Sequence, residues 1–164
     1  MFYRVLILFF LFSRVLSQTN YNDYNDSVNC FETGDYVCSR IGFDDFLNKN
    51  TYTTGAVYEN AQFYLFLSAL RLYHKDTEKL FNQFLHLYPL SNKIDDAHFY
   101  MGEYFFRSKK YSKVVNILAP INIYQIDNKD HALFYLGYSA YKENKYDLAK
   151  SCFFELINSF DSTF

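Results

Sequence analysis

The chain has 164 residues, and half of them are hydrophobic, which is enough for one modest domain with a packed core. The formal net charge of −2 argues against nucleic-acid binding through a basic face. With only five Gly and two Pro, the chain is unlike a β-sandwich or barrel with many tight turns, and helices joined by short polar loops are favoured.

The first 17 residues have the pattern of a signal peptide. Arg4 is followed by an apolar run from Val5 to Phe12, which is far shorter than the roughly 20 residues that span a bilayer. Small or branched residues then allow cleavage between Ser17 and Gln18. We expect an exported chain without a transmembrane segment once 1–17 is removed, with a buried N-terminal helix or strand as the alternative.

Residues 18–29 are polar and rich in Asn, which indicates a flexible linker or a weak first helix. The apolar spacing after them predicts helices over 36–47, 56–73, 77–87, 95–108, 111–119, 130–144 and 146–159. Thr77 or Asp76 is suited to cap the helix that begins there. The best strand candidate is Asn122 to Ile126, for which we nevertheless favour a loop.

Three cysteines are an odd number for an exported protein. Cys30 and Cys38 are able to pair in an oxidising compartment, but we favour the interpretation that these two and Cys152 each pack as a small hydrophobic residue at a helix contact. No C-x-x-C motif occurs, and no histidine stands four residues from another. We therefore expect neither a metal site nor a cofactor.

The segment from Ala132 to Ile157 looks like a second copy of the segment that begins at Ala97, at an offset of 35 residues. The matching pairs are Ala97 with Ala132, Phe99 with Phe134, Tyr100 with Tyr135, Met101 with Leu136, Gly102 with Gly137, and Tyr111 with Tyr146. The glycines indicate that the second helix of each hairpin crosses close to the first. In the last copy we expect Ala149 to face that glycine.

Weaker copies precede these two. Phe63 matches Phe99 at an offset of 36, although Phe66 replaces the glycine, and Tyr36 aligns with Tyr111. Hairpins are thus predicted at about 30–50, 56–88, 95–121 and 130–160. The predicted fold class is all-α: a right-handed α-solenoid of three to four antiparallel hairpins in residues 30–164, possibly truncated at its C-terminus. The alternative is an ordinary helical bundle with accidental internal similarity.

A hairpin that recurs every 34–36 residues is typical of a tetratricopeptide repeat (TPR) array. The runs FETGDY and FNQFLHLYPLSNKIDDAHFYMGEYFF make the chain resemble the N-terminal part of envelope TPR proteins of Bacteroidetes. The resemblance covers most of residues 30–164. It implies a TPR superhelix that is periplasmic or associated with the outer membrane, and a protein or peptide partner.

In the frame of such a repeat, certain first-helix positions line a concave groove. These candidate partner-binding residues are Asn60, Leu67, Arg71, Phe99, Glu103, Arg107, Phe134, Tyr138 and Lys142. Arg71, Arg107 and Lys142 occupy one equivalent position and form a possible basic ladder. The alternative is that these three are solvated residues at helix ends.

The last predicted helix is rich in large apolar residues and has no capping helix after it. We expect Phe153, Phe154, Ile157 and Phe160 to form a docking face for missing repeats, for a second copy of the chain or for a partner.

No catalytic motif is recognised. Asp44-Asp45 and Asp95-Asp96 are adjacent pairs whose carboxylates point in different directions on a helix, and they are better interpreted as helix-start or loop charges. The expected function is therefore a non-catalytic scaffold for protein–protein interaction. The alternatives are a structural spacer or fragment that is stable only when assembled, and carbohydrate binding through surface tyrosines.

Overall fold

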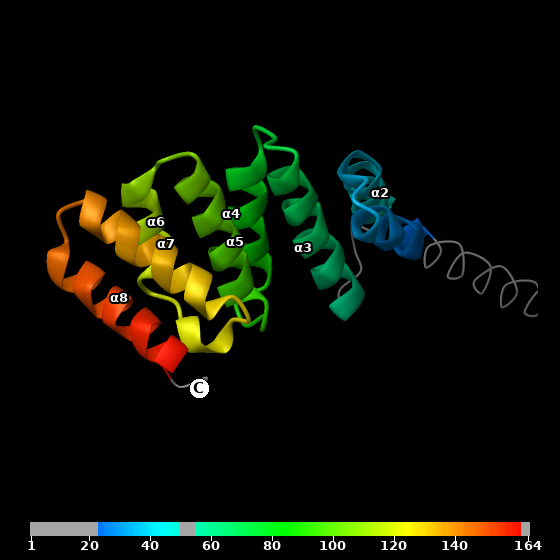
Figure 1. The fold of residues 1–164 in the computed structure, drawn as a ribbon. Helices are drawn as coiled ribbons and strands as arrows, with labels where there is room; N and C mark the ends of the chain where they lie inside the picture. Colours follow the sequence, from blue (N-terminus) through cyan, green and yellow to red (C-terminus); the bar gives the residue numbers. More distant parts are fainter. Residues whose placement is uncertain (1–22, 50–54, 162–164) are drawn as a thin grey trace, which may run out of the picture. The chain divides into compact units, whose positions relative to one another are not determined.

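The computed structural model describes residues 23–49 and 55–161 (Figure 1). All regular structure in this part is helical, which confirms the all-α class. Residues 23–32 are helical, and the elements that follow are α2 (Tyr36–Lys49), α3 (Ala56–Arg71), α4 (Thr77–Leu87), α5 (Ile94–Arg107), α6 (Tyr111–Leu118), the 3-10 turn η1 (Ile123–Gln125), α7 (Lys129–Lys142) and α8 (Tyr146–Asp161). The predicted signal peptide 1–17 lies outside the described residues.

The chain divides into two compact units, Met1–Phe84 and Leu85–Phe164, and the boundary falls within α4. None of the helices in the described part combines the length and the apolar character that a membrane crossing needs. The strand candidate at 122–126 is the short 3-10 turn η1, because the Asn122 side chain accepts a hydrogen bond from the Tyr124 amide.

In the first unit, the helix of residues 23–32 packs on α2, and α2 packs on α3. The Tyr24 ring lies 5.7 Å from the Phe43 ring and 5.6 Å from the Phe46 ring, measured between centroids. The core beneath them consists of Phe43, Phe46, Ala61 and Leu65. From residue 23 onwards the chain is therefore a packed first helix, and the flexible-linker interpretation is wrong there.

The contact between α3 and α4 explains why Phe66 departs from the glycine of the repeat. Phe66 is fully buried, and its ring centroid lies 5.6 Å from that of Phe81 on α4. The Phe63 and Phe84 rings lie 5.3 Å apart next to them. Aromatic rings fill the space in this hairpin, so a large residue is needed where the later hairpins have none.

In the second unit, α5 pairs with α6 and α7 with α8, while α6 and α5 both pack on α7. A Cβ atom on Gly102 would lie 2.6 Å from Leu118 Cδ2, and one on Gly137 would lie 3.0 Å from Cys152 Cβ. The close crossing expected at the two glycines is confirmed. The atoms that would come nearest to a Cβ on Gly137 belong to Cys152 and Phe153, rather than to Ala149.

The turns after α3, α5 and α7 have the same backbone form. Tyr73, Lys109 and Asn144 have φ values of 51°, 56° and 59°, in the left-handed region that commonly ends a helix. The amide that follows each of them donates to the carbonyl five residues earlier, over 2.9, 2.9 and 2.8 Å: His74 to Ala69, Lys110 to Phe105, and Lys145 to Ala140. The internal repeat seen in the sequence is thus repeated in the backbone hydrogen bonds of its turns.

The structure corrects the interpretation of two cysteines. Cys30, at the end of the first helix, forms a disulfide with Cys38 in the first turn of α2. Cys152 is a free, buried cysteine, as expected, and burial raises the pKa of its thiol. The spacing of eight residues suits a disulfide because the turn at Gly34 folds the chain back on itself.

Candidate interaction surface

The end of α5 and the middle of α7 carry a cluster of rings centred on Phe106. We call the five residues below the α5–α7 aromatic cluster. The Phe106 centroid lies 6.2, 5.9, 4.6 and 5.6 Å from the centroids of Tyr111, Phe134, Tyr135 and Tyr138. Edge-on and tilted ring contacts at these distances are favourable beyond the apolar area that they bury.

The α5–α7 aromatic cluster is only partly covered by the rest of the described chain. The exposed fraction of Phe134 is 41%, and Phe106, Tyr111, Tyr135 and Tyr138 are half-buried. Rigid, half-exposed rings are well suited to protein recognition, because they offer much contact area and lose little side-chain freedom on binding.

Charged groups border the aromatic cluster on both helices. Arg107 Nη2 lies 2.8 Å from Glu103 Oε1, and the Tyr135 hydroxyl donates to the same oxygen over 3.5 Å. Burial raises the pKa of the Tyr135 hydroxyl, and the nearby Glu103 carboxylate raises it further. On α7, Lys142 Nζ lies 5.3 Å from the Tyr138 ring centroid, a cation–π contact. The surface therefore offers rings next to charges whose positions are held by neighbours.

Five of the residues predicted to line a groove lie at this surface: Glu103, Arg107, Phe134, Tyr138 and Lys142. Phe99 and Leu67 are only 5% exposed, so the prediction that they line a groove is wrong for both. Phe99 is covered because Tyr135 of the next first helix stacks on it, with 6.3 Å between centroids. Leu67 is one of a run of buried residues on α3.

Asn60 and Arg71 belong to the other unit, on α3, where Asn60 is half-buried and Arg71 is exposed. Arg71, Arg107 and Lys142 are the last residues of α3, α5 and α7. A cation at that position is favoured by the helix dipole, which accounts for their recurrence without a ligand. In addition, Arg107 forms an ion pair with Glu103, and Lys142 lies over the ring of Tyr138.

Phe106 and Tyr135 were not among the residues predicted from the sequence to lie at this surface. A signal for Phe106 was present, because Phe31, Phe106 and Tyr141 each stand five residues before a tyrosine that opens the second helix of a hairpin. For Tyr135 no such signal exists. Its position between Phe134 and Leu136 gave no information about the contact with Glu103.

The residues predicted to form a docking face on α8 differ in exposure. The exposed fractions of Phe154 and Ile157 are 66% and 60%, whereas Phe153 is half-buried next to Gly137 of α7. Phe153 is therefore mainly a residue of the hairpin core. The side chain of Phe160 lies outside the described part of the structure.

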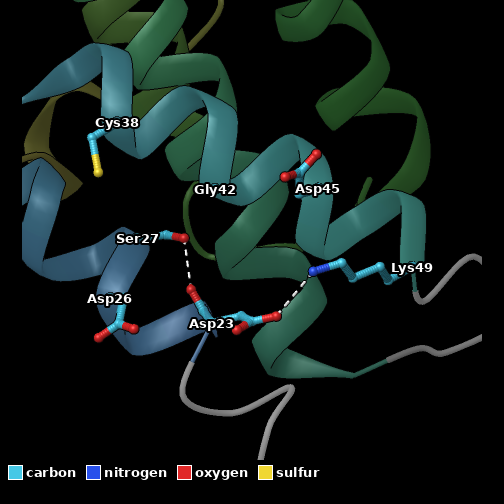
Figure 2. A pocket seen from close by; sticks show the side chains of 7 residues that line it. All are labelled: Asp23, Asp26, Ser27, Cys38, Gly42, Asp45 and Lys49. Atoms are coloured by element: carbon cyan, nitrogen blue, oxygen red, sulfur yellow. Dashed lines mark hydrogen bonds and ion pairs between the residues drawn. The ribbon is translucent and has the colours of Figure 1, made fainter.

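A pocket of about 230 Å³ lies between the first helix and α2 (Figure 2). It is lined by Asp23, Asp26, Ser27, Cys38, Gly42, Asp45 and Lys49. Ser27 Oγ donates to the Asp23 carbonyl over 2.7 Å, and Lys49 Nζ lies 3.1 Å from Asp23 Oδ2. Within residues 23–49 and 55–161, no group of three or more His, Cys, Asp or Glu is placed to hold a metal ion.

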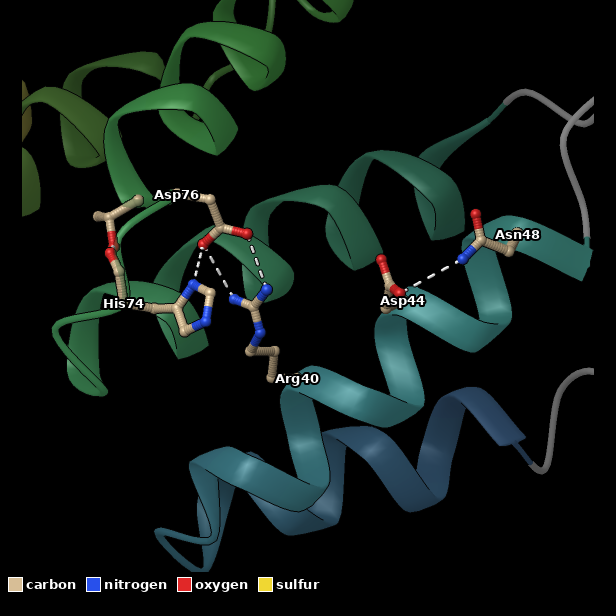
Figure 3. Close-up of polar contacts among 6 residues, drawn as sticks. Arg40, Asp44, Asn48, His74 and Asp76 are labelled. Carbon is tan, nitrogen blue, oxygen red and sulfur yellow. Dashed lines mark hydrogen bonds and ion pairs between the residues drawn. The ribbon is translucent and has the colours of Figure 1, made fainter.

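A polar clamp joins α2 to the turn before α4 (Figure 3). Arg40 Nη2 and Nη1 donate to the two carboxylate oxygens of Asp76 over 2.7 and 3.1 Å, and His74 Nδ1 lies 2.5 Å from Asp76 Oδ1. Asp76 is thus held by Arg40 and His74, while Thr77 Oγ1 donates to the His74 carbonyl. In the same view, Asp44 accepts from Asn48 inside α2, so this aspartate is neither a helix-start nor a loop charge.

Comparisons of the chain with protein-family models, with curated proteins and with solved structures found no match. An inference about function therefore relies on the internal repeat of the chain. This repeat relates the hairpin α5–α6 to the hairpin α7–α8, and both to the earlier turns.

Proposed function

We propose that the protein is a non-catalytic interaction scaffold of the bacterial cell envelope, built as a right-handed array of TPR-like hairpins. It binds a peptide or protein partner on the surface of its first helices. The observation that carries this proposal is the α5–α7 aromatic cluster, in which Phe134 remains 41% exposed. The cluster is bordered by the charges of Arg107 and Lys142.

The recurrence of the turns supports an array. Left-handed residues at Tyr73, Lys109 and Asn144 are separated by 36 and 35 residues, which is the spacing of a tetratricopeptide unit. In such arrays the first helices of successive hairpins lie next to one another and form an extended binding surface. The packing of α5 on α7 agrees with that arrangement.

The signal-peptide pattern of residues 1–17 supports export to the periplasm or to the outer membrane. The disulfide between Cys30 and Cys38 agrees with an oxidising compartment, because such bonds persist outside the cytosol.

Peptide display tests the proposed function. A random peptide library is selected on the protein recovered after export from an expression host, and the bound peptides are then measured by isothermal titration. We expect binders whose affinity falls at least tenfold on Phe134→Ala or Tyr138→Ala, since truncation of an aromatic hot-spot residue costs about 2 kcal/mol or more.

Tyr124→Ala is the matched control, because Tyr124 is an exposed aromatic residue of the same unit whose ring lies against Lys129. Binders that lose affinity equally with all three substitutions, or with none, would contradict a partner site at the aromatic cluster.

One observation favours the second candidate, a structural spacer or a piece of a longer array that is stable only when assembled. Phe154 and Ile157 are largely exposed on α8. Helix α7 packs on α6. A further helix packed on α8 would cover this apolar face.

A further inference from the structure

The first helix has little stability of its own. Residues 23–32 form only ten residues of helix, and isolated helices shorter than about 12–15 residues are marginal in water. Asn25, Asp26, Ser27 and Asn29 also have low helix propensity. The remainder of the unit must therefore hold this segment in place.

The non-covalent contacts of the first helix are mainly apolar: Val28 packs against the core, and the Phe31 ring centroid lies 5.3 Å from that of Tyr36 on α2 and 5.0 Å from that of Tyr64 on α3. Tyr24 packs on the Phe43 and Phe46 rings, and the buried Ser27 lies directly against Gly42, where a Cβ atom would collide with its hydroxyl. The ion pair between Lys49 and Asp23 is more than one-third exposed on both sides, so it contributes little.

The covalent contact is the disulfide between Cys30 and Cys38, which closes the turn between the two helices. Cys38 is exposed and Cys30 is half-buried, so a thiol reductant has access to the bond. A disulfide limits the conformational freedom that residues 23–32 would gain if the first helix detached from α2.

We propose that the Cys30–Cys38 disulfide is a redox-operated clamp on the first helix. One thiolate of a dithiol reductant attacks a cysteine sulfur, breaks the S–S bond and forms a mixed disulfide. The second thiolate displaces that cysteine, which leaves two protein thiols and one oxidised dithiol. Reduction then releases residues 23–32 from α2 and uncovers the apolar surface around Phe43 and Phe46.

The remaining helices of this unit are held by contacts that do not involve the disulfide. Ser39 and Ser68 are buried and hydrogen-bonded over 3.0 Å between α2 and α3. Arg40 reaches Asp76 in the turn before α4. Because these contacts persist after reduction, the release is local, a partial opening of the kind that hydrogen exchange detects.

Hydrogen exchange with mass spectrometry tests the clamp on the full chain as recovered after export, with and without dithiothreitol. We expect the amides of residues 25–33 to exchange at least tenfold faster after reduction, while those of α3 and α8 keep their rates. A mass gain of two hydrogens in the disulfide peptide verifies that the bond is reduced.

Two variants complete the test. Cys152→Ser removes the buried free thiol and should respond to the reductant like the wild type. The double variant Cys30→Ser/Cys38→Ser should exchange fast at residues 25–33 in both conditions. The proposal is overturned if residues 25–33 keep their exchange rate after verified reduction, or if α2, α3 and α4 lose protection together with the first helix.

Discussion

Tyr111 opens α6 with its ring edge-on to Phe106 at the end of α5, 6.2 Å away between centroids and at an interplanar angle of 67°. The same pair recurs at Phe31–Tyr36, with 5.3 Å and 66°, and at Tyr141–Tyr146, with 6.0 Å and 60°. In all three the rings are five residues apart and span the turn of a hairpin.

The ring pair predicts a measurable coupling. A double-mutant cycle with Phe106→Ala and Tyr111→Ala should give a coupling energy of about 0.5–1.5 kcal/mol in urea unfolding, as edge-on pairs do. The matched control is the cycle of Phe106→Ala with Tyr146→Ala, because the Tyr146 ring packs on Tyr141. Equal coupling in the two cycles would show that the contact across the turn is not specific.

Two equivalent serines should respond in opposite ways to truncation. The backbone carbonyls of Ser68 and Ser139 accept hydrogen bonds from the amides of Leu72 and Glu143, which begin the turns after α3 and α7. Ser68 Oγ is paired with Ser39, whereas Ser139 Oγ is buried without a hydrogen-bond partner in the described part of the chain. Replacing Ser68 leaves Ser39 buried and unsatisfied, while replacing Ser139 removes an unsatisfied group.

Urea unfolding should therefore show that Ser68→Ala loses about 1–2 kcal/mol, and that Ser139→Ala is neutral or gains up to about 1 kcal/mol. The difference has a sequence origin, because Val114 stands three residues after Tyr111, where Ser39 stands three residues after Tyr36. A loss of the same size in both variants would rule out this explanation.

A methyl group at Gly102 should destabilise the second unit. A Cβ atom there would lie 2.6 Å from Leu118 Cδ2 and 2.7 Å from its Cγ, and Leu118 is fully buried. Overpacking of about 1–3 kcal/mol outweighs the gain of about 1 kcal/mol that Ala has over Gly in a helix. Gly102→Ala should lower the thermal midpoint, and Asn116→Ala on the exposed side of α6 should not.

Asp76 should make unfolding stability depend on pH in the acid range. Burial alone would raise the pKa of its carboxyl, but hydrogen bonds from Arg40 and His74 outweigh burial and bring it below the usual 3.8. A carboxyl with a lowered pKa contributes stability that is present above pH 3.8 and is lost as the pH falls through the folded-state pKa.

Asp76→Asn should therefore cost about 1–2 kcal/mol at pH 7, with a smaller difference from the wild type in strong acid. Asp44→Asn is the control, because Asp44 is an exposed residue that accepts a hydrogen bond from Asn48 within α2. A cost for Asp76→Asn that stays constant from pH 7 to pH 2 would refute the linkage.

The exposed face of α8 predicts association. If a second chain or a further helix covers Phe154 and Ile157, the protein should form dimers or larger species in light scattering with size exclusion. Phe154→Glu and Ile157→Glu should then give monomers with unchanged helix content. Ile41→Glu, at an exposed apolar residue of α2, should leave the association intact. A wild-type protein that is monomeric at high concentration would contradict docking at this face.

Helix positions followed from local information, because the 3.6-residue period and the turn residues operate within one segment. The stretch predicted at 77–87 is α4, and 111–119 differs from α6 by one residue. The sequence also predicted that helices cross closely at Gly102 and Gly137. The first helix at 23–32 was ambiguous, since its sequence favours helix weakly and its packing on Phe43 and Phe46 decides the outcome.

The sequence predicted which repeat positions contribute to the candidate site, but it did not predict how exposed each side chain is. Phe99 and Phe134 hold the same position in the repeat, but Phe99 is 5% exposed and Phe134 is 41% exposed. The reason is Tyr135 of α7, whose ring stacks on that of Phe99. Burial depends on which neighbour arrives from elsewhere in the chain, and a repeat pattern does not contain that information.

The amino-acid sequence by itself determined the all-helical class, the approximate helix limits and the internal period of 35 residues, since all three follow from local spacing. Only the tertiary structure decided that Cys30 and Cys38 are bonded, with their Cα atoms 5.8 Å apart, and that the rings around Phe106 form one cluster. Both depend on distances between segments, which packing sets after the helices have formed.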